Sequence, residues 1–143
     1  LKAQAGLITN DDVDSFFHFY LGGMPGLKGY PFYSIQETKN GLLDITLRVP
    51  LFREKHYKLN WLILQNSTLG MILQAGDAWT DEISIKKSLG IQWRLNGFSF
   101  FNFPTAIEAE YHHPLNKFER IINEETIDYG EKGRAYVKVL FDF

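Results

Sequence analysis

The side chains best suited to chemistry stand on one short segment late in the chain. Glu108, Glu110 and His112 occur at every second position, and residues spaced by two point to the same face of a strand. Such a row could supply an acid and base pair, or a carboxylate and an imidazole for a metal ion. However, no third metal ligand is evident, and nothing nearby gives the two carboxylates contrasting environments. We therefore predict hydrogen bonding as their role, no enzymatic activity, and no metal or other cofactor.

Arg94 and Glu108 are a second candidate pair. They flank the segment 98–104, which contains four phenylalanines and ends in a proline. If that segment is a turn, the two residues face each other on adjacent strands, because they lie at matching distances from it. We interpret them as a structural ion pair, an interaction that contributes little net stability.

The composition excludes several classes of function. A chain of 143 residues normally forms one domain, and its formal net charge of -2 provides no broad basic surface for nucleic acid. Cysteine is absent, which excludes disulfides, thiolate metal sites and cysteine catalysis. No uninterrupted apolar run approaches the length of a transmembrane helix. Aromatic residues make up 15% of the chain, a high share for a soluble enzyme.

Alternation of apolar and polar residues predicts an all-β fold. In the segment 42–52, Leu43, Ile45 and Leu47 share one face, and Asp44 and Arg48 lie on the other. No segment shows helical periodicity over a convincing length. We expect about six strands, with 57–79 forming either one long strand or two that separate near 66–68. The expected strands are 42–52, 57–79, 86–96, 105–113 and 134–143, and the segment 1–9 alternates weakly.

A glycine-rich loop precedes the first clear strand. Gly22, Gly23, Gly26 and Gly29 fall within eleven residues, and Lys28 is the single cation among them. Glycine permits backbone conformations closed to other residues and lets a chain pass close to its neighbours. We predict that the segment 9–36 folds back as a compact loop with Lys28 at its tip.

Two architectures produce amphipathic strands of this kind. A soluble barrel that carries an apolar ligand places its apolar face inside, whereas a membrane barrel places it against lipid around a polar lumen. The longest connections, the glycine-rich loop and the polar segment 114–133, would lie on the same side of an up-and-down barrel, as outer loops of bacterial membrane barrels do. These features favour the membrane barrel, with 114–133 as a long outer loop.

Aromatic residues gather at the strand ends that would form the opposite side. An aromatic girdle at a boundary between lipid and water has this placement, and a soluble barrel has no reason for it. The girdle therefore also favours an antiparallel up-and-down transmembrane β-barrel. The residues are Phe52, Tyr57, Phe98, Phe100, Phe101, Phe103, Phe141 and Phe143.

The order of short motifs resembles the end of the bacterial surface antigen barrel, the membrane domain of the outer-membrane protein assembly factor family. That family has a glycine-rich loop with Arg-Gly-Phe or Arg-Gly-Tyr at its tip, and here Gly22-Gly23 precedes Leu27-Lys28-Gly29-Tyr30. The family's Arg-x-Pro-Leu strand end is similar to Arg48-Val49-Pro50-Leu51. Three further strands match in order over nearly the whole chain. They are Leu73-Gln74-Ala75-Gly76-Asp77-Ala78-Trp79, Ser88-Leu89-Gly90-Ile91-Gln92-Trp93-Arg94 and Glu110-Tyr111-His112-His113-Pro114-Leu115.

The resemblance assigns roles to particular residues. It implies that Lys28, Gly29 and Tyr30 anchor the loop in the barrel lumen and that Phe141 and Phe143 form a C-terminal signal read by assembly machinery. In the family, the loop arginine pairs with a strand aspartate, at whose position this chain has Gln74. An ammonium and an amide would form a weaker and less directional contact than a guanidinium and a carboxylate.

The resemblance also implies a location, a function and partners. It predicts residues 1–143 to be the C-terminal part of an outer-membrane β-barrel that inserts or exports proteins in bacteria. The partners would be outer-membrane lipid, a preceding part of the same protein and assembly proteins, without nucleic acid. Similar barrels follow a TolB-like propeller or a patatin-like lipase domain, so a passive membrane anchor is the alternative, and a soluble carrier of an apolar ligand is the third hypothesis.

Overall fold

The computed structural model describes residues 1–9, 13–100, 102–122 and 125–141, and it confirms the all-β prediction. One short 3-10 turn, η1, is the only helical segment among these residues, and none of their helices is long and apolar enough to cross a membrane. The elements are β1 (Lys2–Leu7), η1 (Ser15–Phe17), β2 (Phe19–Tyr20), β3 (Gln36–Glu37), β4 (Lys39–Phe52), β5 (Tyr57–Leu59), β6 (Leu62–Trp79), β7 (Lys86–Ser99), β8 (Phe103–Pro114), β9 (Phe118–Ile122), β10 (Glu125–Tyr129) and β11 (Arg134–Phe141).

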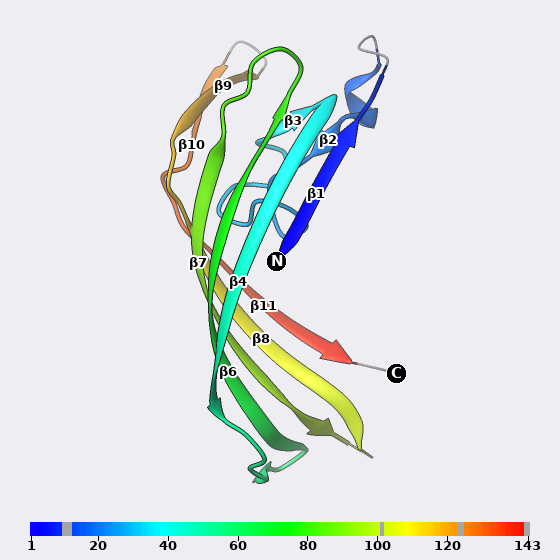
Figure 1. Ribbon diagram of the computed structural model, residues 1–143, viewed down its shortest axis with the longest axis vertical. Coiled ribbons are helices and arrows are strands. Elements are labelled where there is room, and N and C mark those ends of the chain that lie inside the picture. Colours follow the sequence, from blue (N-terminus) through cyan, green and yellow to red (C-terminus); the bar gives the residue numbers. More distant parts are fainter. Residues whose placement is uncertain (10–12, 101, 123–124, 142–143) are drawn as a thin grey trace. The chain divides into compact units, whose positions relative to one another are not determined.

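The main sheet is antiparallel and has seven strands (Figure 1). Its order is β1-β4-β6-β7-β8-β11, with β5 paired to β6. Sequential neighbours are thus hydrogen-bonded from β4 to β8, as the up-and-down prediction requires. Among the described residues, β1 and β11 stand at the two ends of this order.

One sequence prediction needs correction. The segment 57–79 does divide, but at Asn60 and Trp61 and not at 66–68, because Asn60 takes a positive φ of 42° that turns β5 into β6. Within the segment 114–133, β9 and β10 form an antiparallel pair, a detail that the sequence does not predict. Apolar and polar residues do not separate onto two faces there, and Glu119, Ile121 and Asp128 are all exposed.

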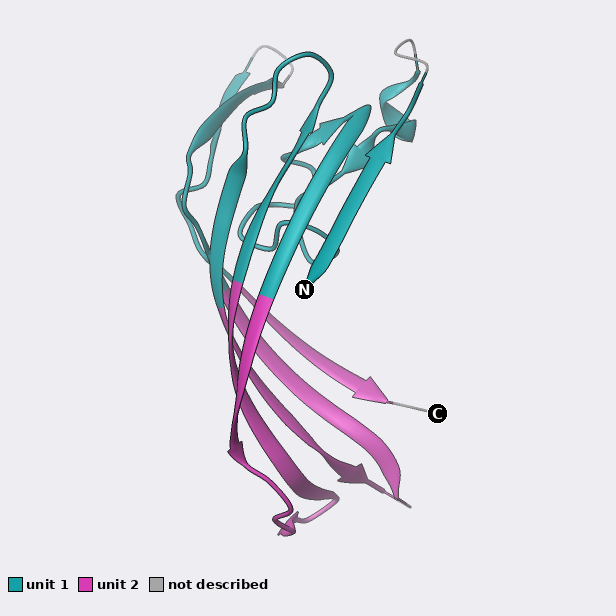
Figure 2. Ribbon diagram, viewed as in Figure 1, with its two compact units in different colours: residues 1–45, 73–90, 112–134 teal, residues 46–72, 91–111, 135–143 magenta. Residues whose placement is uncertain are grey.

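The chain divides into two compact units. Figure 2 shows that the division falls within the long strands. Unit 1 contains residues 1–45, 73–90 and 112–134, and unit 2 contains residues 46–72, 91–111 and 135–143.

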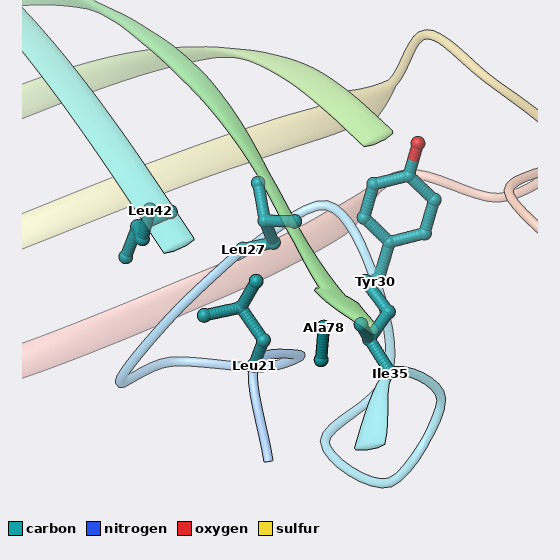
Figure 3. Packing of buried hydrophobic residues seen from close by; sticks show 6 residues of the cluster. All are labelled: Leu21, Leu27, Tyr30, Ile35, Leu42 and Ala78. Atoms are coloured by element: carbon teal, nitrogen blue, oxygen red, sulfur yellow. The ribbon is translucent and has the colours of Figure 1, made fainter. Parts of the chain in front are cut away.

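Unit 1 contains a small apolar core between the glycine-rich loop and the sheet. Leu21, Leu27, Tyr30 and Ile35 come from the loop segment, and β4 and β6 contribute one residue each. Figure 3 shows Leu21 and Leu27 close together, with the Tyr30 hydroxyl extending beyond the group. This core fastens the loop to the polar face of the strands. The strand residues are Leu42 and Ala78.

The buried positions of unit 2 include polar and charged residues, beside apolar residues such as Leu62, Leu64 and Ile72 of β6. Gln92, Glu108 and Glu110 are each less than 5% exposed, and they lie on β7 and β8. Buried carboxylates are costly unless they are paired and hydrogen-bonded. This face of unit 2 therefore depends on interactions among its polar side chains.

The apolar faces of both units are exposed. In unit 1, strand residues Leu43, Leu73 and Leu89 are exposed, whereas Gln74 and Ser88 beside them are buried. A soluble antiparallel sheet has the reverse arrangement, with its apolar face packed and its polar face solvated. In unit 2 the exposed apolar strand residues include Leu47, Val49, Leu51, Leu69, Met71, Ile91, Trp93, Tyr111, Val137 and Val139.

Candidate functional site

Gln74 is the point at which the glycine-rich loop meets the strands of unit 1. Its Oε1 accepts from the backbone N–H of Lys28 at 3.0 Å and from the Ser88 hydroxyl at 3.1 Å. Its Nε2 donates to the Gly26 carbonyl at 3.1 Å and to Asp44 Oδ2 at 2.8 Å. One buried amide thus links the loop to β4 and β7 with both its donor hydrogens and its acceptor oxygen in use.

The structure places Lys28 beside Gln74, but through a different atom from the one the sequence suggests. The backbone N–H of Lys28, and not its ammonium, makes the 3.0 Å bond. A neutral amide suits this position because it can accept from one peptide group and donate to another, whereas a carboxylate only accepts. Gln74 therefore bonds to the backbone of the loop at Lys28 and Gly26. A comparison of side-chain types could not indicate these backbone contacts.

Gly29 brings the loop into direct contact with the strands. A Cβ built at Gly29 would lie 2.7 Å from Ser88 Cβ and 3.2 Å from the Pro114 nitrogen. Only glycine permits this approach without displacement of its neighbours. The spacing of Lys28 and Gly29 thus lets the loop reach Gln74 and β7 together.

Tyr30 fastens the other side of the loop tip. Its side chain is fully buried, and its hydroxyl lies 3.0 Å from the Lys87 carbonyl and 2.9 Å from the Asn116 carbonyl. The Tyr30 ring also packs against Phe118 of β9, with 5.7 Å between ring centroids. Burial raises the pKa of the Tyr30 hydroxyl above 10.0, and the hydrogen bonds with Asn116 and Lys87 lower it by less.

The remaining loop glycines shape its internal turn. Gly23 has a φ of +79°, and its N–H donates to the Tyr30 carbonyl at 2.8 Å. Gly22 forms an isolated bridge with Leu27, and the N–H of Gly26 donates to the Gly23 carbonyl at 3.2 Å. The loop is therefore held by its own backbone bonds as well as by the strands, as the glycine content predicts.

Asp77 of β6 and Lys86 of β7 form an ion pair that the sequence does not predict. Strict alternation would point Asp77 to the apolar face or the rim, but the connection between β6 and β7 covers it, and it is only 2% exposed. Its carboxylate accepts from Lys86 Nζ at 2.5 Å and from the N–H groups of Ala78 and Ser84. Lys86 Nζ also lies 5.1 Å from the centre of the Phe118 ring, a cation–π distance.

Unit 2 contains the ion pair between Arg94 and Glu108 as part of a larger network. Arg94 Nη1 lies 3.4 Å from Glu108 Oε2, and Lys138 of β11 lies 3.1 Å from Glu108 Oε1. Lys138 also lies 3.4 Å from Glu110, which accepts from Gln92 Nε2 at 2.7 Å. The sequence indicated the first pair from its distance to the turn, but it could not indicate that Lys138 joins both glutamates.

Arg48 enters the same network across an intervening strand. Its Nε donates to Gln92 Oε1 at 2.7 Å, although β6 lies between β4 and β7. Gly70 of β6 makes room, because a Cβ there would lie 3.4 Å from Arg48 Cγ and 3.3 Å from Gln92 Oε1. The network therefore spans β4, β7, β8 and β11 over the polar face of unit 2.

The other sequence candidates are not brought together as a reaction site. His112 is fully buried on β8 and His113 is exposed, and no group of three or more possible metal ligands occurs within the described ranges. Phe141 ends β11 with its ring half exposed, and Phe143 lies outside the described residues.

Comparisons with models of known protein families, with curated proteins and with solved structures found no match. The site must therefore be interpreted from its own geometry. That geometry is a loop locked to the strands by an amide in unit 1, and a neutralised row of charges in unit 2.

The role of Gln74 can be tested by replacing it with alanine. Gln74→Ala removes four hydrogen bonds and leaves buried partners unsatisfied, which should weaken loop docking by about 2–3 kcal/mol. We expect tryptic cleavage after Lys28 in the folded protein to accelerate roughly 30- to 150-fold. Gln4→Ala, at an exposed position of β1, is the control. Equal cleavage rates in Gln74→Ala and the unmodified protein would contradict the role of Gln74.

The raised pKa of Tyr30 predicts that the stability of loop docking depends on pH. A docked loop keeps this phenol protonated above pH 10.0, whereas a released loop lets it ionise there, so docking is fully stable below that pH and weakens as pH rises. In an ultraviolet titration of phenolate absorbance, Tyr30→Phe should remove one tyrosine that ionises at a higher pH than an exposed tyrosine. Tyr33→Phe, at an exposed loop position, should leave this late component in place. Loss of an early component in Tyr30→Phe would refute the prediction.

Proposed function

We propose that this chain is part of a transmembrane β-barrel of the bacterial outer membrane. The observation that carries the proposal is the arrangement of the strands, in which many large apolar side chains are exposed and the carboxylates of Glu108 and Glu110 are buried. Membrane barrels have apolar residues facing lipid and polar residues facing the lumen along every strand. The aromatic residues Tyr57, Trp61, Phe100 and Phe103, exposed at strand ends of unit 2, fit an interfacial girdle.

The open strand order fits the same proposal. Backbone groups at a sheet edge must be paired inside a membrane, because the hydrocarbon core provides no water to bond them. Among the described residues β1 and β11 end the strand order, and their outer edges would then be paired with further strands of the same protein. Outer-membrane lipid and that additional part of the barrel are the partners that we expect.

Within this class, we favour insertion or export of proteins as the function. The support is the docked glycine-rich loop, which meets the strands at Gln74. That is the position at which the resemblance to the outer-membrane protein assembly factor family places the loop's partner. The loop tip occupies the polar face that would line the lumen, so its release would alter the space available there.

A passive anchor for another domain is the second candidate. The observation in its favour is that an amide and backbone groups replace the family's arginine and aspartate pair. A soluble carrier of an apolar ligand has less support than either. It would need Leu47, Ile91 and Val139 inside, but all three are more than half exposed.

A charge on the apolar face tests the membrane proposal. Ile91→Arg would place a guanidinium in lipid and should destabilise the inserted state by about 2–4 kcal/mol if the residue lies near the bilayer centre. Ile83→Arg is a matched control, because Ile83 is 59% exposed in a connection and Ile91 is 60% exposed in β7. We expect Ile91→Arg alone to lower the yield of heat-modifiable protein in vesicles. Equal yields for the two variants would contradict a lipid-facing β7.

A folding assay with a second outer-membrane protein distinguishes the assembly function from the anchor function. Vesicles that contain the protein would receive an unfolded outer-membrane protein, and its folding would be followed by heat-modifiable migration. An assembly function predicts faster folding than in empty vesicles and a loss of that acceleration in Gln74→Ala, because the loop is released. An anchor predicts the same rate in all three preparations.

A further inference from the structure

A cavity in unit 2 combines aromatic walls with a cation and two amides. It has a volume of about 460 Å³ and lies where the turn between β5 and β6 meets the turn between β7 and β8. Neither the buried charge network nor the glycine-rich loop contributes to it. The residues around it include Lys58, Asn60, Trp61, Phe98, Phe100 and Asn102.

The two turns are joined to each other, so the cavity has a defined wall. The rings of Trp61 and Phe100 stack with 5.4 Å between centroids and an interplanar angle of 15°. The N–H of Phe100 donates to the Trp61 carbonyl at 3.1 Å. Phe100 keeps this position with a φ of 31°, a left-handed conformation that is uncommon for a bulky residue. Both rings nevertheless stay about half exposed.

The charge beside this wall is positive. The segment from β4 to β5 carries Arg53, Lys55 and Lys58, against one acid, Glu54. All four are exposed, and Lys58 lines the cavity. Asn60 and Asn102, also at the cavity, supply amide groups that can donate or accept hydrogen bonds. A ligand that matches this set needs an anionic group, hydroxyls and an apolar portion.

We propose that this cavity binds the headgroup region of an anionic glycerophospholipid such as phosphatidylglycerol. Lys58 attracts the phosphate, the two asparagine amides bond to the glycerol hydroxyls, and the Trp61–Phe100 stack contacts the start of the acyl chains. Clustered cations at a membrane surface attract anionic lipids, and aromatic rings occupy the headgroup level. The inference rests on the proposed membrane location and adds a defined lipid site to it.

The test compares two lysines of the same segment. The protein in micelles would receive equal amounts of phosphatidylglycerol and phosphatidylcholine, and native mass spectrometry would count the retained lipids. We expect Lys58→Gln to reduce the preference for phosphatidylglycerol about fivefold, the effect of one lysine near an anionic surface. Lys55→Gln makes the same charge change outside the cavity and should reduce the preference far less. Trp61→Leu should lower retention of phosphatidylglycerol without a change in charge.

Three outcomes would overturn the site. Equal losses in Lys58→Gln and Lys55→Gln would indicate diffuse attraction by surface charge. Displacement of phosphatidylglycerol by excess inorganic phosphate would indicate a free-anion site, and equal retention of both lipids would indicate no headgroup selection. Circular dichroism of each variant verifies that it folds.

Failure of this site and failure of the membrane proposal give different results. Insertion into vesicles without a preference for phosphatidylglycerol overturns only the lipid site. Lack of insertion, with Ile91→Arg behaving like Ile83→Arg, overturns the membrane location whatever the micelle measurement gives.

Discussion

Glu110 is only 3% exposed, and its carboxylate is balanced by Lys138 at 3.4 Å and by Gln92 at 2.7 Å. Other side chains of unit 2 form a network around such groups. Glu108 shares Lys138, Arg94 completes that pair, and Arg48 reaches Gln92 over Gly70. A buried ion that loses its partner is strongly destabilising, so the members of this network depend on one another. Burial of these charged side chains costs free energy. Contact of the apolar face with lipid would offset that cost.

In unit 1 the same polar face is covered by the protein itself. The glycine-rich loop places its backbone against Gln74 and its apolar side chains against Leu42 and Ala78. The phenol of Tyr30 then joins the loop to β7 and to the connection before β9. The loop is thus fixed by short-range bonds and a small core, which a single change at Gln74 could release.

Much of the fold could be predicted from sequence, because alternation with a period of two reports the faces of a strand directly. Leu43 and Asp44, or Ile91 and Gln92, lie on opposite faces as their types indicate. The sequence could not show that Gln74 bonds to the backbone of the loop, since a backbone partner leaves no trace in residue types. Nor could it place Asp77, whose burial depends on the fold of the connection between β6 and β7. The sequence has no strong turn motif at Asn60, so it did not predict that the segment 57–79 divides there.

We propose that lipid contacts the exposed apolar face, and Trp93 allows a direct measurement of that contact. Its ring is half exposed on β7, and its indole N–H donates to Ser67 at 2.9 Å. The protein has three tryptophans, so Trp61→Phe with Trp79→Phe leaves Trp93 as the only emitter. In vesicles whose acyl chains carry bromine, the account predicts strong quenching of Trp93 and protection from aqueous acrylamide. Quenching by acrylamide, with no effect of brominated lipid on folded protein, would contradict it.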